Sequence, residues 1–141
     1  MIVAGLTGSI AMGKSETAKM IAAKGIPVFD SDAAVHEMYA AGGEAVEPLR
    51  AVVPDAIGHD GVDRRKLASL VQADPALLKR IEAIVHPLVR ARQATFLADA
   101  ARHAELAVLD IPLLFETGRE KEVDVVIVVS ADQEQQRKRA L

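Results

Sequence analysis

Four residues near the amino terminus, Gly8, Gly13, Lys14 and Ser15, have the types and spacing of a phosphate-binding P-loop. In such a loop, backbone N–H groups and the start of a helix point at one place and suit the β-phosphate of a nucleotide. Lys14 would supply positive charge to the β- and γ-phosphates, and the Ser15 hydroxyl would bind Mg²⁺. The alternative is a glycine turn that binds nothing, which the strand-loop-helix context disfavours.

Carboxylates that follow apolar runs are the next candidates, because phosphoryl transfer needs a group that orients or deprotonates the acceptor hydroxyl. Asp30 and Asp32 follow one such run. We favour Asp32 as the base, since Asp30 has an equally good role as a helix cap. Asp110 ends another apolar run, as a Walker-B aspartate does, and would hold the Mg²⁺ shell. Many strands end in aspartate, so Asp110 indicates a metal site only because the chain also contains a P-loop.

The remaining polar candidates fit structural roles better. His86 lies in an apolar helical pattern, which favours a buried, hydrogen-bonded histidine over a catalytic one. The basic run at 137–139 is typical of a solvated face, although arginines there could reach the phosphates in a kinase with a closing lid. The other histidines are expected on the surface: His36, His59 and His103.

The elements that must position these residues alternate between strands and helices. Apolar runs predict strands at 1–6, 26–29, 106–110 and 123–129. Helical spacing predicts helices at 18–23, 33–40, 44–53, 64–72, 74–86, 87–103 and 131–141. A loop is expected at 54–63, and a loop or short helix at 111–120. Pro87 is expected to break or kink the long pattern at His86. Gly25 is expected to end the first helix, and Asp63 to cap the helix that follows it.

Nearly continuous apolar strands alternating with helices indicate the α/β fold class, with a parallel sheet covered on both faces. Ligands of such sheets bind beyond the carboxyl ends of the strands. The segments 8–15, 30–32 and 110–116 all follow predicted strand ends. Three candidate sites are therefore expected at one edge of the sheet.

Composition narrows the class of protein. The 141 residues fit one domain, and the net charge of -3 lacks the basic character of a nucleic-acid-binding protein. There is no cysteine for disulfide or thiol chemistry. No apolar stretch reaches membrane-spanning length, and the amino terminus lacks the basic start of a signal peptide, so a cytoplasmic protein is expected. The last predicted helix stops in mid-pattern without a capping glycine, which suggests that the natural chain continues.

These residues together resemble the dephospho-CoA kinase family. The resemblance rests on four motifs that occur in family order: the opening Gly5 to Ser15, Val28 to Ala33 with its Asp-x-Asp, Ile84 to Val89 with its His-Pro, and Asp110 to Glu116 with Pro-Leu-Leu-Phe-Glu. The P-loop is shared by many kinases, whereas the other three motifs narrow the resemblance to this family. Two P-loop positions depart from the family pattern, Ala11 in place of glycine and Glu16 in place of threonine.

The resemblance implies a P-loop NTPase three-layer fold with a parallel sheet and a helical substrate-binding insertion. The core would comprise 1–43 and 105–141, and a helical CoA-binding region 44–104. It implies ATP-dependent phosphorylation of the ribose 3′-hydroxyl of dephospho-CoA, the final step of coenzyme A biosynthesis, with ATP and Mg²⁺ as cofactors. It also implies a lid whose arginines lie further along the chain. A monomer or weak homo-oligomer is expected, with no nucleic acid or membrane as partner.

The site residues expected from the motifs fall into four groups. The catalytic residues are Asp32 and Lys14. The ATP-binding residues are Gly8, Ala11, Met12, Gly13, Lys14, Ser15 and Glu16. The substrate contacts are Asp30, Asp32, His86, Pro87, Phe115 and Glu116, and the metal ligands are Ser15 and Asp110. Two alternatives remain open: another small-molecule kinase with a P-loop, and a non-catalytic module that binds a nucleotide.

Overall fold

The computed structural model describes residues 1–8, 13–111, 114 and 118–129, and the chain divides into two compact units. The first unit comprises Met1–Asp32 and Thr95–Leu141, and the second comprises Ala33–Ala94. The second unit shares residues 44–94 with the helical region expected from the sequence. Each unit has its own packing and is described separately.

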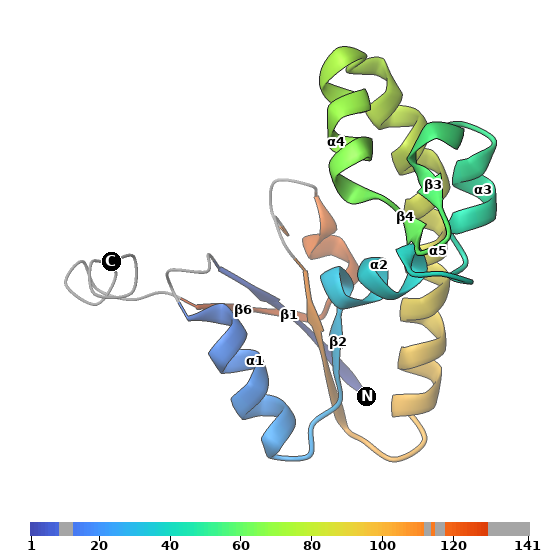
Figure 1. Cartoon of the computed structure of the whole chain (residues 1–141). Helices are drawn as coiled ribbons and strands as arrows, with labels where there is room; N and C mark the ends of the chain where they lie inside the picture. The colour runs from blue at the N-terminus through green and yellow to red at the C-terminus, as the bar shows by residue number, and fades with distance from the viewer. Residues whose placement is uncertain (9–12, 112–113, 115–117, 130–141) are drawn as a thin grey trace. The chain divides into compact units, whose positions relative to one another are not determined.

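The first unit contains a four-stranded parallel sheet (Figure 1). Its strand order is β2-β5-β1-β6, with β1 at Ile2–Thr7, β2 at Val28–Asp30, β5 at Leu106–Asp110 and β6 at Val125–Val128. All neighbours run parallel, so the predicted sheet type and the four predicted strands are confirmed. Parallel strands end on one edge, and the carboxyl ends of β1, β2 and β5 meet there.

Helix α1, Lys14–Ala23, covers one face of this sheet. Its residues Ala18 and Ile21 pack against a buried cluster formed by Ala4, Leu6 and Val108. Removing these side chains from water is the main favourable contribution to holding α1 on the sheet. The helix begins at Lys14, so its packing also fixes the position of Lys14 and of the N-cap residue Gly13.

The opposite face of the sheet is covered by the end of a long helix, α5, at Ala76–Ala100. Side chains alternate along a strand, so Phe29 points away from the α1 side, toward which its neighbour Val28 packs. The Phe29 ring lies with its centroid 5.5 Å from that of Phe96 on α5. The prediction that both faces of the sheet are covered is therefore confirmed.

Strand β6 is shorter than predicted because the Asp124 side chain takes part in the pairing with β1 just before the strand begins. The backbone N–H of Asp124 donates to the carbonyl of Val3, and the Asp124 carboxylate accepts from the Val3 N–H, both at 2.8 Å. A side chain thus replaces a backbone partner, and the regular ladder with β1 begins at Val125. The aspartate amid the β-branched run marks the strand boundary.

The second unit holds most of the helices. The elements that belong to it, or begin at its boundary, are α2 (Ser31–Tyr39), α3 (Val46–Arg50), a 3₁₀ turn (Pro54–Ala56), β3 (Ile57–Gly58), β4 (Gly61–Val62), α4 (Arg64–Ala73) and most of α5. No helix in the described ranges is long and apolar enough to cross a bilayer. Within this unit Arg92 of α5 binds two carboxylates, Glu37 of α2 and Glu44, which ties three segments together.

Two features of this unit differ from the sequence prediction. The first is the stretch 54–63, which was expected as a loop but contains a two-stranded antiparallel pair, with Ile57 opposite Val62 and Gly58 opposite Gly61. Gly61 has a φ of 93°, and a Cβ there would lie 2.2 Å from the Tyr39 carbonyl oxygen, so the glycine permits a tight turn against α2. Helix α3 ends at Arg50 because Pro54 holds the residue before it, Val53, out of helical conformation at φ -132°.

The predicted cap of α4 is confirmed. The Asp63 carboxylate accepts hydrogen bonds from the backbone N–H groups of Arg65 and Lys66, both at 3.1 Å. Replacing Asp63 with alanine is expected to lower the free energy of unfolding by about 1 kcal/mol, because two amide donors lose their partner. Urea denaturation measures this change. Asp63→Asn, which keeps an acceptor, should lose clearly less, and equal losses in the two variants would contradict the capping role.

The prediction of a helix break at His86 is wrong, because α5 runs unbroken over 25 residues, and the alternative of a kink there stays a prediction. One face of the helix is buried through Ile81, Val85 and Val89, and Pro87 lies on the exposed side. The carbonyl that loses its donor belongs to Ala83, which is also exposed, so water can satisfy it. The prediction of a buried His86 is wrong as well: His86 is exposed, as are the other three histidines.

A proline inside α5 should still lower the stability of the fold. Pro87→Ala is expected to raise the free energy of unfolding, by up to about 3 kcal/mol, because alanine restores the helical hydrogen bond and removes the ring clash. Chemical denaturation measures the gain. The control Arg90→Ala, at another exposed position of α5, should change stability by less than about 0.5 kcal/mol. A loss of stability in Pro87→Ala would contradict this account.

Candidate active site

The P-loop lies between the end of β1 and the start of α1, where the sequence places it. Gly8 has a φ of 145°, and a Cβ there would lie 2.8 Å from the carbonyl oxygen of Val129, the residue after β6. Gly13 has a φ of 83° and stands at the N-cap of α1. Both glycines therefore hold backbone conformations that other residues adopt only with strain. Ala11 and Met12 lie outside the described residues.

Lys14, the first residue of α1, is buried although it carries a charge. Its Nζ lies 2.6 Å from Oδ1 of Asp110, the last residue of β5, and each side chain is only 10% exposed. This buried ion pair joins the P-loop to the neighbouring strand end. The sequence analysis placed both residues at this edge of the sheet, but their direct contact could not be predicted because the two residues are far apart along the chain.

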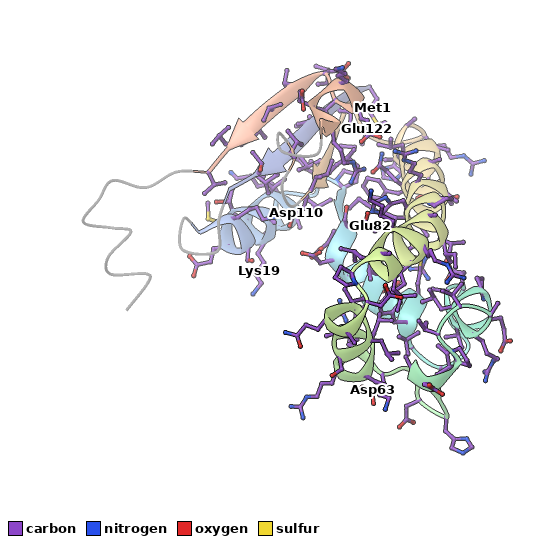
Figure 2. The ribbon with its side chains drawn as sticks, turned by 90° about the horizontal axis from the view of Figure 1, so that it is seen from above. Met1, Lys19, Asp63, Glu82, Asp110 and Glu122 are labelled. Carbon is purple, nitrogen blue, oxygen red and sulfur yellow. The ribbon has the colours of Figure 1, made fainter. Side chains whose placement is uncertain are left out.

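Asp110 is surrounded by more negative than positive charge. In the sheet it lies opposite Leu6 of β1 and Asp30 of β2. Burial raises the pKa of the Asp110 carboxyl above its usual range, the Lys14 ammonium opposes that rise, and the charges of Asp30 and Asp32 add to it. The three aspartates and the P-loop lysine thus share one edge of the sheet, as the sequence predicted. Figure 2 labels Asp110 there.

The segment 30–32 turns from β2 directly into α2. Asp30 ends the strand, and Asp32 lies in the first turn of the helix. Both residues are exposed. Ser31 between them is 6% exposed, and its hydroxyl has no hydrogen-bond partner in the described part of the chain. Its burial could not be read from the sequence.

The other predicted residues differ in how far the structure describes them. Ser15 and Glu16 are exposed in the first turn of α1. Among the described residues no group of three or more potential metal ligands occurs, so Ser15 and Asp110 remain predicted metal ligands. His86 and Pro87 belong to the second unit, and their contact with substrate stays a prediction. Phe115 and Glu116 lie outside the described residues.

The second unit also contains a cavity of about 320 Å³. None of the predicted site residues lines it. Its wall combines small residues with one arginine, one histidine and one glutamate: Ala41, Gly42, Gly43, Val46, Glu47, Arg50, Gly58, His59 and Gly61. Arg50 and Glu47 form an ion pair with each other, so the charges at this cavity largely cancel.

A model of the dephospho-CoA kinase family matches residues 1–141, the whole chain. The chain belongs to the dephospho-CoA kinase family. A dephospho-CoA kinase of Bradyrhizobium diazoefficiens is 54% identical over 142 residues, and the match covers 100% of this chain and 70% of that protein. One of Ruegeria pomeroyi is 52% identical, with 97% of this chain and 68% of that protein covered. The chain thus spans about 70% of the length of these relatives.

Solved structures support the fold of this dephospho-CoA kinase family member. A crystal structure of a Thermus thermophilus protein superposes with a TM-score of 0.82 at 38% identity, covering 99% of this chain and 70% of that one. A dephospho-CoA kinase from Campylobacter jejuni superposes with a TM-score of 0.68 at 15% identity, covering 97% and 92%, which is evidence for the fold alone. The predicted family, the α/β P-loop fold and the kinase class are confirmed.

Proposed function

We propose that this chain transfers the γ-phosphoryl group of ATP to the ribose 3′-hydroxyl of dephospho-CoA, the final step of coenzyme A biosynthesis. One structural observation is the main support for this proposal. A P-loop lysine and three aspartates meet at the carboxyl edge of one parallel sheet, in a chain of the dephospho-CoA kinase family. Phosphoryl transfer requires this combination of phosphate-binding and proton-accepting groups.

The phosphates would bind at the amino terminus of α1. The positive φ values of Gly8 and Gly13 let the loop backbone approach an anion closely, and the helix dipole adds partial positive charge. Lys14 stands at the first position of that helix and would neutralise oxygens of the β- and γ-phosphates. The charge of Glu16 is exposed on the same turn, where the solvent screens it.

Asp32 would accept the proton of the acceptor hydroxyl. As the new bond forms between the ribose oxygen and the γ-phosphorus, the bond to the leaving ADP oxygen breaks, and the hydroxyl proton passes to the Asp32 carboxylate. Exposure in the first turn of α2 supports this role, because the carboxylate must reach a bound substrate. Asp30, at the end of β2, would help to orient the same hydroxyl.

Ser15 and Asp110 would hold Mg²⁺. The residues fit a hard cation, because the site offers carboxylate and hydroxyl oxygens and an excess of negative charge around Asp110. When bound, Mg²⁺ offsets the charge that develops on the phosphate oxygens. The protein's own part is to keep the Asp110 oxygens buried and fixed at the end of β5.

The second unit would contribute the binding region for dephospho-CoA, as the family resemblance implies. The same resemblance implies that His86, Pro87, Phe115 and Glu116 would be substrate contacts. As an enzyme of coenzyme A biosynthesis, the protein is expected to act in the cytoplasm, as a monomer or weak homo-oligomer.

A coupled assay of ADP release tests the proposal. The chain is supplied with ATP, Mg²⁺ and dephospho-CoA, and adenosine and shikimate serve as control acceptors. Because the chain spans about 70% of its relatives, the full-length Bradyrhizobium diazoefficiens relative is assayed beside it as the second protein. The expected result is that at least one of the two proteins releases ADP with dephospho-CoA as acceptor and that neither does so with adenosine or shikimate. Turnover with a control acceptor, or ATP binding without turnover in both proteins, would contradict the proposal.

A further inference from the structure

We infer that Arg92 is a positioning residue for the proposed reaction, because it fixes the far end of the helix whose first turn carries Asp32. The inference rests on the proposed function insofar as it takes Asp32 to be the base. It goes beyond that function by giving a role in turnover to a network of ion pairs outside the four sequence motifs. In this role Arg92 acts through α2 and not by contact with the substrate.

The network consists of one guanidinium and two carboxylates, all within the second unit. Nε and Nη2 of Arg92 donate to Oε2 and Oε1 of Glu44, at 2.7 and 2.5 Å, and Nη1 donates to Oε2 of Glu37, at 2.5 Å. Arg92 lies on α5, Glu37 lies on α2, and Glu44 lies between α2 and α3. One side chain thus connects three separate segments of the chain.

The geometry of the network makes it stronger than an ordinary surface ion pair. An isolated exposed pair contributes little, but a bidentate arginine that also binds a second carboxylate is the exception to that rule. The hydrogen bond from Arg92 lowers the pKa of the Glu44 carboxyl, so the pair stays charged in neutral solution. The guanidinium is planar and its donors have fixed directions, so it sets the orientation of both partners as a lysine would not.

Helix α2 is held at its two ends by different contacts. At its start, Ser31 follows β2 with no intervening residue, and the last residue of β2 is paired in the sheet. Towards its end, Glu37 is bound by Arg92. Asp32 and Glu37 are five residues apart in the same helix, about 7.5 Å along its axis. A change in the tilt or rotation of α2 at Glu37 is therefore carried to the turn that holds Asp32.

Apolar packing also holds α2, through buried side chains such as Ala34 and Met38. Burial of apolar surface is non-directional, so it constrains the rotation of a helix less than a hydrogen-bonded fork does. A general base must lie within hydrogen-bond reach of its hydroxyl, and a displacement of about 1 Å can cost about 10²-fold in rate. Loss of Arg92 should therefore slow the chemical step and leave nucleotide binding unchanged.

Steady-state kinetics of ADP release with dephospho-CoA tests the inference on the full chain. Arg92→Met should lower kcat by about tenfold, because the far end of α2 loses its directional contact. The KM for dephospho-CoA and the dissociation constant for ATP should stay within about twofold of wild type. A rise in KM with unchanged kcat would show that Arg92 binds the substrate directly, and would overturn the inference.

Glu37→Ala tests the same contact from the other side. It removes the tie to α2 but leaves Arg92 with Glu44, so kcat should fall by about threefold or more. The double variant of Arg92→Met with Glu37→Ala should be no slower than Arg92→Met alone, because both changes remove one and the same tie. An unchanged kcat in Glu37→Ala, or losses that multiply in the double variant, would overturn the inference.

Arg50→Met is the matched control, because it removes the same charge from an ion pair of the same unit. Arg50 and its partner Glu47 both belong to α3, so this pair joins no second element. The kcat of this variant should stay within about twofold of wild type. If Arg50→Met lowers kcat as much as Arg92→Met does, the loss of positive charge is the cause and the inference is wrong.

Circular dichroism checks that each variant folds. If Arg92→Met does not fold, Glu37→Ala decides the inference alone: a lower kcat with an unchanged KM supports it, and any other result refutes it. Absence of turnover in the wild-type chain overturns the inference as well, because there is then no reaction for Arg92 to support. Wild-type turnover with an unchanged kcat in Arg92→Met refutes only this inference and leaves the proposed function standing.

Discussion

Replacing Asp32 with asparagine is expected to lower kcat for dephospho-CoA phosphorylation by about 10²- to 10⁴-fold, the usual contribution of a general base. Asparagine has nearly the same shape but cannot accept the hydroxyl proton. Asp32 is exposed in the first turn of α2, so the change should leave the fold intact. The dissociation constant for ATP with Mg²⁺ should change little, because the phosphates bind at the P-loop. Single-turnover kinetics and calorimetry measure the two quantities.

Asp30→Asn is the matched comparison for this experiment. Asp30 ends β2, lies opposite Asp110 in the sheet and is exposed like Asp32. If Asp30 only orients the hydroxyl, its variant should retain clearly more activity than Asp32→Asn. The reverse order would assign the base to Asp30, and full activity in Asp32→Asn would show that this carboxylate accepts no proton.

Local signals in the sequence predicted much of the fold. The apolar run 106–110 is β5 with the same boundaries, and Asp63 caps α4 as its position before a helical pattern indicated. Both features depend on neighbours within a few residues, which a sequence shows directly. The shared edge of the sheet could also be predicted, because parallel strands bring all their carboxyl ends together.

Features that depend on distant contacts could not be predicted in this way. Proline usually ends a helix, but α5 continues through Pro87, and the buried side chains of Ile81 and Val85 stabilise the helix on its apolar face. Gly61 reads as a loop residue, whereas its close approach to the Tyr39 carbonyl belongs to a hairpin turn. The contact of Lys14 with Asp110 is the main case in the candidate site, since only the folded sheet brings the two charges together.

Lys14→Met is the variant with the broadest expected consequences, because the lysine has both a binding and a structural role. It should abolish measurable ATP binding, since the P-loop loses its positive side chain. It should also lower the free energy of unfolding by about 3 kcal/mol near neutral pH, because the carboxylate of Asp110 is left buried without its partner. Denaturant titration and calorimetry measure the two effects separately.

The double variant Lys14→Met with Asp110→Asn separates the two roles. Removing the second charge leaves no unpaired ion at the end of β5, so most of the lost stability should return. ATP binding should not return, because the lysine is still absent. If the double variant is no more stable than Lys14→Met, the loss comes from the packing of residue 14 in α1 rather than from the charge of Asp110.

The pH dependence of Lys14→Met gives an independent check on the same ion pair. Burial already raises the pKa of Asp110, and Lys14 opposes that rise, so the pKa of the carboxyl should rise further in the variant. The folded state then holds a proton that the unfolded state has released, and stability falls as the pH rises from the ordinary carboxyl range through the raised pKa. The stability deficit relative to the double variant should therefore shrink between about pH 7.5 and about pH 4.5. A deficit that stays constant over this range would show that the Asp110 charge does not cause it, whereas a shrinking deficit would identify the unpaired carboxylate as its source.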